Sequence, residues 1–288
     1  MNRTFAWVGW LGLWTVAVGT AQPTDPQPEK LLPPEQILEV LTSSKSSNEA
    51  KKLALASVAP DGGMNEPIYR QIGRRLLEML NVPKETPLTP DIIAALARLG
   101  RWEFDLVKDG LTWQSWQVRR DTALALGLMD EFGLEAIPNL AALANDPDWP
   151  VRQAVANALG RLLKADAERQ SSYANHRKAL IGLAKDRVWN VRMTALNSLG
   201  EIDSEALGVT VIKQIESATQ DKEWPVRKAA VVALGKLKSK RSLPVLLALA
   251  KPPGDPHPEV RDAAKEAVRL IDSDEAIRHG LILPPKKE

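Results

Sequence analysis

The sequence predicts an all-α fold in which short helical hairpins stack into a solenoid. One phrase recurs five times, with Trp, Val and Arg followed by small residues and a Leu-Gly pair. Its valines are 33, 40, 35 and 34 residues apart, and a period in this range is typical of repeat arrays. They are Val118, Val151, Val191, Val226 and Val260. No segment alternates apolar and polar residues as a half-buried strand would.

The chain begins with a segment that resembles a secretory signal peptide. Arg3 supplies the positive charge, residues 6–18 are apolar, and small residues precede Gln22, so we expect residues 1–21 to be removed after Ala21. An uncleaved N-terminal anchor is the alternative, although the apolar run is short for a membrane span. Five prolines in residues 22–34 then predict an extended linker, because proline opposes both helix and sheet pairing.

Residues 35–109 form the next predicted region, and their apolar residues recur at helical spacing. Pro67 is well placed to begin a helix, and Gly100 to end one. These helices are either degenerate repeats or a separate helical cap, and the sequence leaves both possibilities open.

The regular array is predicted over residues 110–272, with two antiparallel helices in each unit. In the best-formed unit, Pro150 suits the first position of the second helix, and Val151 begins a continuous apolar stripe. Gly160 is predicted near the end of that helix, where glycine can adopt a left-handed conformation. Polar residues 164–174 account for the longest spacing and predict a loop or an extended helix end. Residues 273–288 are assigned to a C-terminal tail.

The repeated phrase resembles the HEAT repeat, and more narrowly the short HEAT-like repeats of the phycobilisome-lyase type, within the broader armadillo-like helical class. The resemblance covers residues 110–271 and implies a right-handed α-solenoid of stacked helical hairpins. Physical reasoning agrees, because a lone hairpin exposes an apolar stripe that stacking buries against its neighbours. The last unit departs from the phrase, with Val268-Arg269 in place of Leu-Gly, as a terminal cap would.

Charged residues also recur in register, and two interpretations of them differ in function. The arginines could form a basic stripe for phosphate groups. Alternatively, each arginine pairs with the Asp of its own or the next unit, which the balanced charge of the chain favours. The predicted structural ladder consists of Asp146 with Arg152, Asp186 with Arg192, Asp221 with Arg227 and Asp255 with Arg261. The first unit has Trp113 instead of Asp, so it lacks an Asp-dependent contact.

Tryptophans occupy one repeat position, two residues before the valine, and are the candidate binding residues. They are Trp116, Trp149, Trp189 and Trp224. They could form an aromatic track for a sugar, a peptide or a partner protein, since tryptophan is enriched at interface hot spots. They could equally pack over the turn between helices, and a half-buried ring can serve both roles.

Composition narrows the possible chemistry. The chain of 288 residues contains no cysteine, which excludes disulfides, thiolate metal sites and cysteine nucleophiles. Its three histidines have no second histidine or carboxylate at metal-ligand spacing, so we expect no metal site and no cofactor. With 38 basic and 36 acidic residues, the chain is not a typical polyanion binder.

Enzymes with related repeats provide the alternative function. Bilin lyases act in the cytoplasm, whereas we expect this chain to be exported. Deoxyhypusine hydroxylase, an oxidoreductase, requires His-Glu pairs as iron ligands, and the sequence contains no His-Glu dipeptide. HEAT-like DNA glycosylases need a nucleic-acid substrate that an exported protein does not meet. The sequence therefore predicts a non-enzymatic scaffold or adaptor, periplasmic or secreted, that binds a protein or another macromolecular partner through its solenoid surface. We expect it neither to bind nucleic acid nor to keep a transmembrane span once mature.

Overall fold

The computed structural model describes residues 31–58, 67–81, 87–169, 177–202 and 204–283. The chain divides into two units, Met1–Leu31 and Leu32–Glu288, and all the helices described below belong to the second unit. The expected signal peptide, residues 22–30 of the linker, residues 170–174 of the polar insertion and the last five residues lie outside the described ranges. No strand occurs among the described residues.

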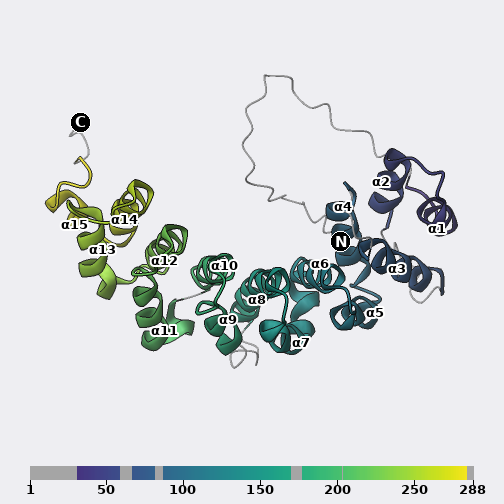
Figure 1. The fold of residues 1–288 in the computed structure, drawn as a ribbon, viewed down its shortest axis with the longest axis horizontal. Coiled ribbons are helices and arrows are strands. Elements are labelled where there is room, and N and C mark those ends of the chain that lie inside the picture. The colour runs from purple at the N-terminus through teal and green to yellow at the C-terminus, as the bar shows by residue number, and fades with distance from the viewer. Residues whose placement is uncertain (1–30, 59–66, 82–86, 170–176, 203, 284–288) are drawn as a thin grey trace, which may run out of the picture. The chain divides into compact units, whose positions relative to one another are not determined.

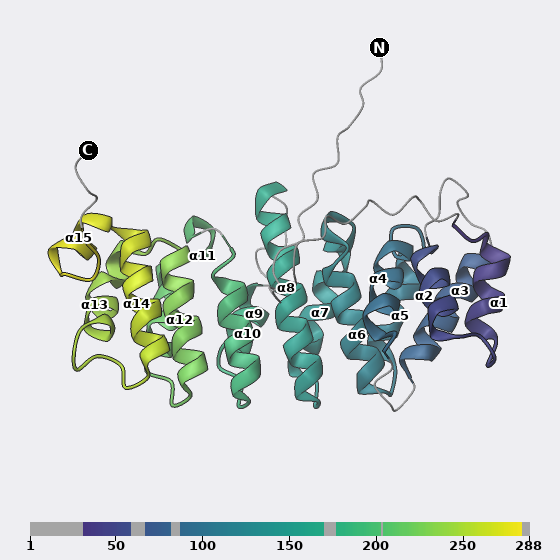
Figure 2. The same ribbon diagram turned by 90° about the horizontal axis from the view of Figure 1, so that it is seen from above.

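The helices form two rows, as Figures 1 and 2 show. The second helices of successive hairpins make up one row: α2 (Asn48–Ala56), α4 (Thr89–Leu99), α6 (Trp116–Gly127), α8 (Trp149–Arg169), α10 (Trp189–Leu199), α12 (Trp224–Lys236) and α14 (Pro258–Ile271). Each of these helices packs against the next one in that order. The stacking buries the apolar face that a single hairpin would leave exposed.

The first helices of the hairpins make up the other row: α1 (Pro34–Thr42), α3 (Pro67–Leu80), α5 (Phe104–Asp109), α7 (Ile137–Ala142), α9 (Arg177–Leu183), α11 (Ser204–Ala218) and α13 (Leu243–Ala250). Short 3-10 segments complete some of them: η1 (Gly110–Thr112), η2 (Asp130–Ala136), η3 (Leu143–Asn145) and η5 (Lys240–Ser242). The all-α solenoid predicted from the repeat is therefore the observed fold.

The repeated valines anchor the core. Val151, Val191 and Val226 each have 0% of their surface exposed, and each lies in the first turn of its second helix. Burying a side chain of this size contributes about 1.5–3 kcal/mol. Because the same position is filled in every unit, one continuous core runs along the array.

The glycine near the end of each second helix has a different role from the one expected. Gly200 has the right-handed angles φ −67° and ψ −12°, and Gly160 lies inside α8. A Cβ atom on Gly127 would lie 2.7 Å from the Cα atom of Ala158, and one on Gly200 would lie 2.8 Å from the Cα atom of Ala233. The glycines are thus required by the close approach of the next helix, and not by a left-handed helix end.

Both ends of the array contain regular structure. α1 packs on α3, and α2 packs on α4, so the two N-terminal hairpins continue the stacking of the others. Arg98 of α4 fastens this region by donating to the carbonyls of Leu55 and Val58, at 2.6 and 2.9 Å. At the other end, the segment assigned to a tail begins with helix α15 (Ser273–Arg278), whose N-terminus is capped by Asp272.

The insertion between two repeats lengthens a helix. α8 continues to Arg169, so the first part of the polar segment 164–174 forms an extended helix end and not a loop. Figure 2 shows this end of α8 projecting beyond the neighbouring second helices.

Candidate protein-binding surface

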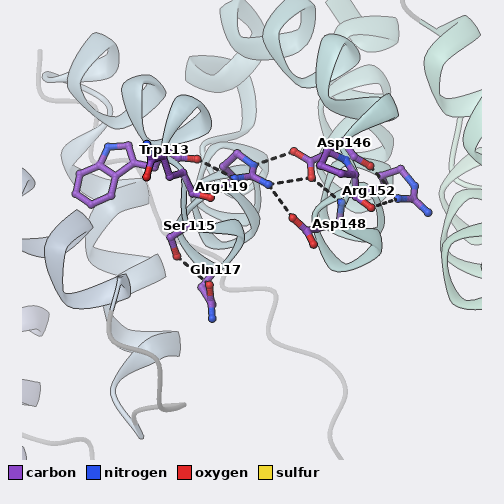
Figure 3. A network of polar contacts seen from close by, with 9 residues as sticks. Trp113, Ser115, Gln117, Arg119, Asp146, Asp148 and Arg152 are labelled. Atoms are coloured by element: carbon purple, nitrogen blue, oxygen red, sulfur yellow. Dashed lines mark hydrogen bonds and ion pairs between the residues drawn. The ribbon is translucent and has the colours of Figure 1, made fainter.

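The repeated arginine and aspartate residues form a ladder that links each unit to the next. In the first rung, Arg119 donates to both carboxylate oxygens of Asp146, with Nε–Oδ2 and Nη2–Oδ1 distances of 2.8 and 3.1 Å (Figure 3). Its Nη1 donates to the carbonyls of Trp113 and Gln114 at 2.8 and 2.7 Å. The guanidinium therefore joins two units and also closes the turn that precedes the second helix of its own unit.

The next three rungs repeat this geometry between Arg152 and Asp186, Arg192 and Asp221, and Arg227 and Asp255. Their Nε–Oδ2 distances are 2.6, 2.7 and 2.6 Å. Arginine thus pairs with the carboxylate of the following unit, while the Asp of its own unit contributes only its backbone carbonyl. These arginines are engaged inside the fold and do not form a free basic stripe.

Each ladder aspartate also closes the turn that precedes a second helix. Its Oδ1 accepts the backbone N–H two residues further on, from Asp148, Val188, Glu223 and His257, at 2.8–2.9 Å. Burial by itself would raise the pKa of Asp186, Asp221 and Asp255. The hydrogen bonds from the arginine and the backbone outweigh burial, and the pKa of all three carboxyl groups lies below its ordinary value.

None of the four predicted pairs forms through the carboxylate of the same unit, because each arginine contacts only the backbone carbonyl of that aspartate. The last pair differs from the others in one further respect. The carboxylate of Asp255 is taken by Arg227, and Arg261 donates its Nη1 to the backbone carbonyl of Asp255 at 2.7 Å. Arg261 repeats the position of the other arginines, but no described carboxylate occupies its remaining donors.

The four tryptophans share a position but differ in what covers them. Arg120 lies over the ring of Trp116, with its guanidinium carbon 5.1 Å from the ring centroid. His257 stacks on Trp224, with ring centroids 3.9 Å apart and an interplanar angle of 5°. Trp149 and Trp189, in the two central units, are 41% and 38% exposed. The row is therefore half-buried at both ends and open in the middle.

A hollow of about 250 Å³ lies on the second-helix side of the same units, between α6, α8 and α10. Pro150, which follows Trp149 in the chain, forms part of its wall. Arg120 also lines it and is held by both carboxylate oxygens of Asp121, at 2.7 and 3.0 Å. Gln153 donates to the hydroxyl of Thr194 across two helices, at 3.1 Å. The hollow thus combines fixed polar groups with an apolar wall.

Sequence reasoning did not single out Arg120 and Gln153. Both stand two residues after the repeated valine, where the other units carry Met193, Lys228 and Asp262. Because the residue type changes from unit to unit, the repeat phrase does not mark this position, although its constant register could have done so. Trp149, Trp189 and the hollow together are named the Trp149–Trp189 surface below.

Within the described ranges, no three or more His, Cys, Asp or Glu side chains gather as they would around a metal ion. Among the described helices, none has the length and hydropathy that a membrane span needs. A second hollow, of about 540 Å³, lies near the C-terminal ends of α10 and α12 and is lined by Glu201, Lys236 and Leu270.

Comparisons with known proteins agree with this geometry. A family model described as HEAT repeats matches residues 105–172 and 211–279. The fold and the repeated ladder define the class as a helical-repeat solenoid, and the family match shows that its repeats are HEAT repeats. The search of the curated proteins gave no match.

Solved structures with a similar fold include the karyopherin Kap121p bound to Nup53p and the same protein bound to Pho4p. Both comparisons have a TM-score of 0.67 and 16% identity, and they cover 85% of this chain and 31% of the karyopherin. An engineered protein is also similar, with a TM-score of 0.50 and 18% identity over 85% of this chain and 71% of its own. At these identities the likeness concerns the fold alone.

Proposed function

We propose that this protein is an exported, non-enzymatic scaffold that binds a protein partner through the Trp149–Trp189 surface. The observation that carries the proposal is the contrast between the two sets of repeated residues. The arginines and aspartates of the four rungs are engaged with one another, whereas Trp149 and Trp189 keep 41% and 38% of their surface exposed. What the array offers to a partner is therefore aromatic.

Tryptophan suits this role because a large, rigid ring covers much apolar area at little cost in side-chain entropy. The two rings belong to the first residues of α8 and α10, and these helices together with α6 line a hollow whose polar groups are already held in place by Asp121 and Thr194. Preorganised groups of this kind lower the entropic cost of binding. A protein surface or a peptide could contact both rings and the hollow together.

The likeness to Kap121p supports a protein partner, because structures of that karyopherin contain Nup53p or Pho4p. Export rests on the amino-terminal sequence, with Arg3 ahead of the apolar residues 6–18 and a small residue, Ala21, at the expected cleavage site. A reporter fused to residues 1–30 should leave the cytoplasm, and its retention there would contradict the export part of the proposal.

The binding part is tested by capture with matched variants. The protein carrying Trp149→Ala and Trp189→Ala is compared with wild type, and proteins retained from the cells that make it are identified by mass spectrometry. We expect the amount of a reproducibly captured partner to fall by about tenfold or more in the variant, as it does when an interface hot spot is removed. Trp102→Ala is the control, because Trp102 is 40% exposed and lies outside the row.

Thermal unfolding separates binding from packing in the same variants. Since neither tryptophan is part of the buried core, we expect the melting temperature to fall by no more than a few degrees. Unchanged capture together with a large fall would assign the row to packing and contradict the proposal. Loss of capture in Trp102→Ala as well would show that the effect is not specific to this surface.

A further inference from the structure

The last unit of the array presents an arginine in binding geometry without its carboxylate. Arg261 donates Nη1 to the carbonyls of Asp255 and Pro256 at 2.7 and 3.0 Å. Arg227 makes the equivalent bonds to Asp221 and Lys222 at 3.0 and 3.2 Å. In Arg227 the Nε and Nη2 atoms then hold Asp255, whereas no described carboxylate holds those atoms of Arg261.

The helix edge that carries Arg261 differs from the same edge of the inner units. In α8 the positions four and eight residues after the arginine are Ala156, which is fully buried, and Gly160, which lies against Ser198 of the next unit. In α14 those positions are Lys265 and Arg269. An ordinary repeat would have to bury both charges to stack here, so this edge opposes a further hairpin.

The other two cations of this edge are paired on their own helix. Lys265 donates to Asp262 at 3.0 Å, and Arg269 donates to Glu266 at 2.7 and 2.6 Å. Within this row of three, Arg261 therefore keeps unused donors, and its two backbone bonds hold the guanidinium in the orientation seen in the other rungs.

We infer that Arg261 is a receptor for one carboxylate of a partner protein, an Asp or Glu presented on a turn. The four inner rungs support the choice of ligand, because the same guanidinium in the same setting binds an aspartate from a turn each time. A planar guanidinium matches a carboxylate through two parallel hydrogen bonds. Because Lys265 and Arg269 are already paired with Asp262 and Glu266, Arg261 is the cation of this row whose charge is left to attract an acidic group. The inference stands apart from the Trp149–Trp189 surface.

A peptide taken from the array tests the inference on the whole protein. The probe is the acetylated and amidated segment 218–226, which contains Asp221 and the turn that delivers it to Arg192. The ¹⁵N signal of Arg261 Nε, assigned with the Arg261→Lys variant, is followed during titration. We expect a saturable shift, and at least tenfold weaker binding of the matched peptide with Asn in place of Asp.

Variants and a second anion complete the test. Arg261→Lys should weaken the peptide at least tenfold, because an ammonium lacks the two-pronged fork, whereas Arg269→Gln should bind it as wild type does. Equal responses to the Asp and Asn peptides would overturn the inference. So would saturation by inorganic phosphate at the same concentration, which would mark an unselective anion site. Because the signal is read in the wild-type protein, poor folding of a variant does not decide the outcome.

Discussion

At the residue scale, the ladder shows how buried charges are accommodated between repeats. Arg152 is 5% exposed, and the side chain of its partner Asp186 is 9% exposed, so both have lost most of their water. The two side-chain hydrogen bonds and the carbonyls of the turn replace the lost hydration. Removing one partner of such a pair lowers the free energy of unfolding by more than the intact pair contributes to it, because the other charge stays buried.

Asp186→Asn should therefore lower the free energy of unfolding by about 1–3 kcal/mol, because it leaves the guanidinium of Arg152 without its counter-charge. Urea unfolding measures the change. Asp262→Asn is the control, since the Asp262 side chain is 71% exposed and pairs only with Lys265 on the surface. A change within about 0.5 kcal/mol is expected there. Equal effects of the two substitutions would show that the ladder contributes no more to stability than a surface ion pair.

At the element scale, small residues decide how closely the second helices approach. The glycine near the end of one helix lies against a small residue of the next, as Gly127 does with Ala158 and Gly235 with Ala267. The contact is with backbone atoms, which cannot rotate away as the end of a long side chain can. The glycines therefore set the spacing of the array.

Gly127→Ala should destabilise the protein by about 1–3 kcal/mol, because the added Cβ would lie 2.7 Å from the Ala158 backbone. Gly182→Ala is the matched control, since no atom lies within 4 Å of its added Cβ. Alanine is the better helix former, so this control should gain up to about 1 kcal/mol. Thermal and urea unfolding of the two variants measure the expected loss of stability in one and the expected gain in the other. A gain in both would mean that the helices separate at little cost.

At the scale of the whole molecule, stability is a sum of similar contacts between neighbours. Each unit contacts mainly the units before and after it, so the ladder, the valines and the small residues act at every junction. The last unit departs from this pattern, because Lys265 and Arg269 replace the apolar and glycine positions of the inner helices. An ordinary hairpin stacked on this edge would therefore have to bury both charges.

Acid should loosen the junctions that contain Asp186, Asp221 and Asp255 in one pH range. The folded pKa of Asp186, Asp221 and Asp255 lies below the ordinary value near 3.9, so the unfolded chain binds protons first as the pH falls. The stability contributed by these carboxylates is complete above about pH 5 and is lost as the pH drops through their folded pKa values. Circular dichroism melts at pH 7, 5 and 3 should show little change between the first two and a marked fall at pH 3. A constant melting temperature down to pH 3 would contradict this.

The period by itself determined the fold class of this protein, because Val151, Val191 and Val226 recur at the spacing of a hairpin and can be buried only by neighbouring hairpins. It also predicted that Arg and Asp belong together and placed the four tryptophans in one row. The partner of each arginine, the close contact behind each glycine, and the exposure of Trp149 and Trp189 but not of Trp224 were decided by tertiary structure. These features depend on the distances between side chains of neighbouring units. The spacing of residues along the chain does not report those distances.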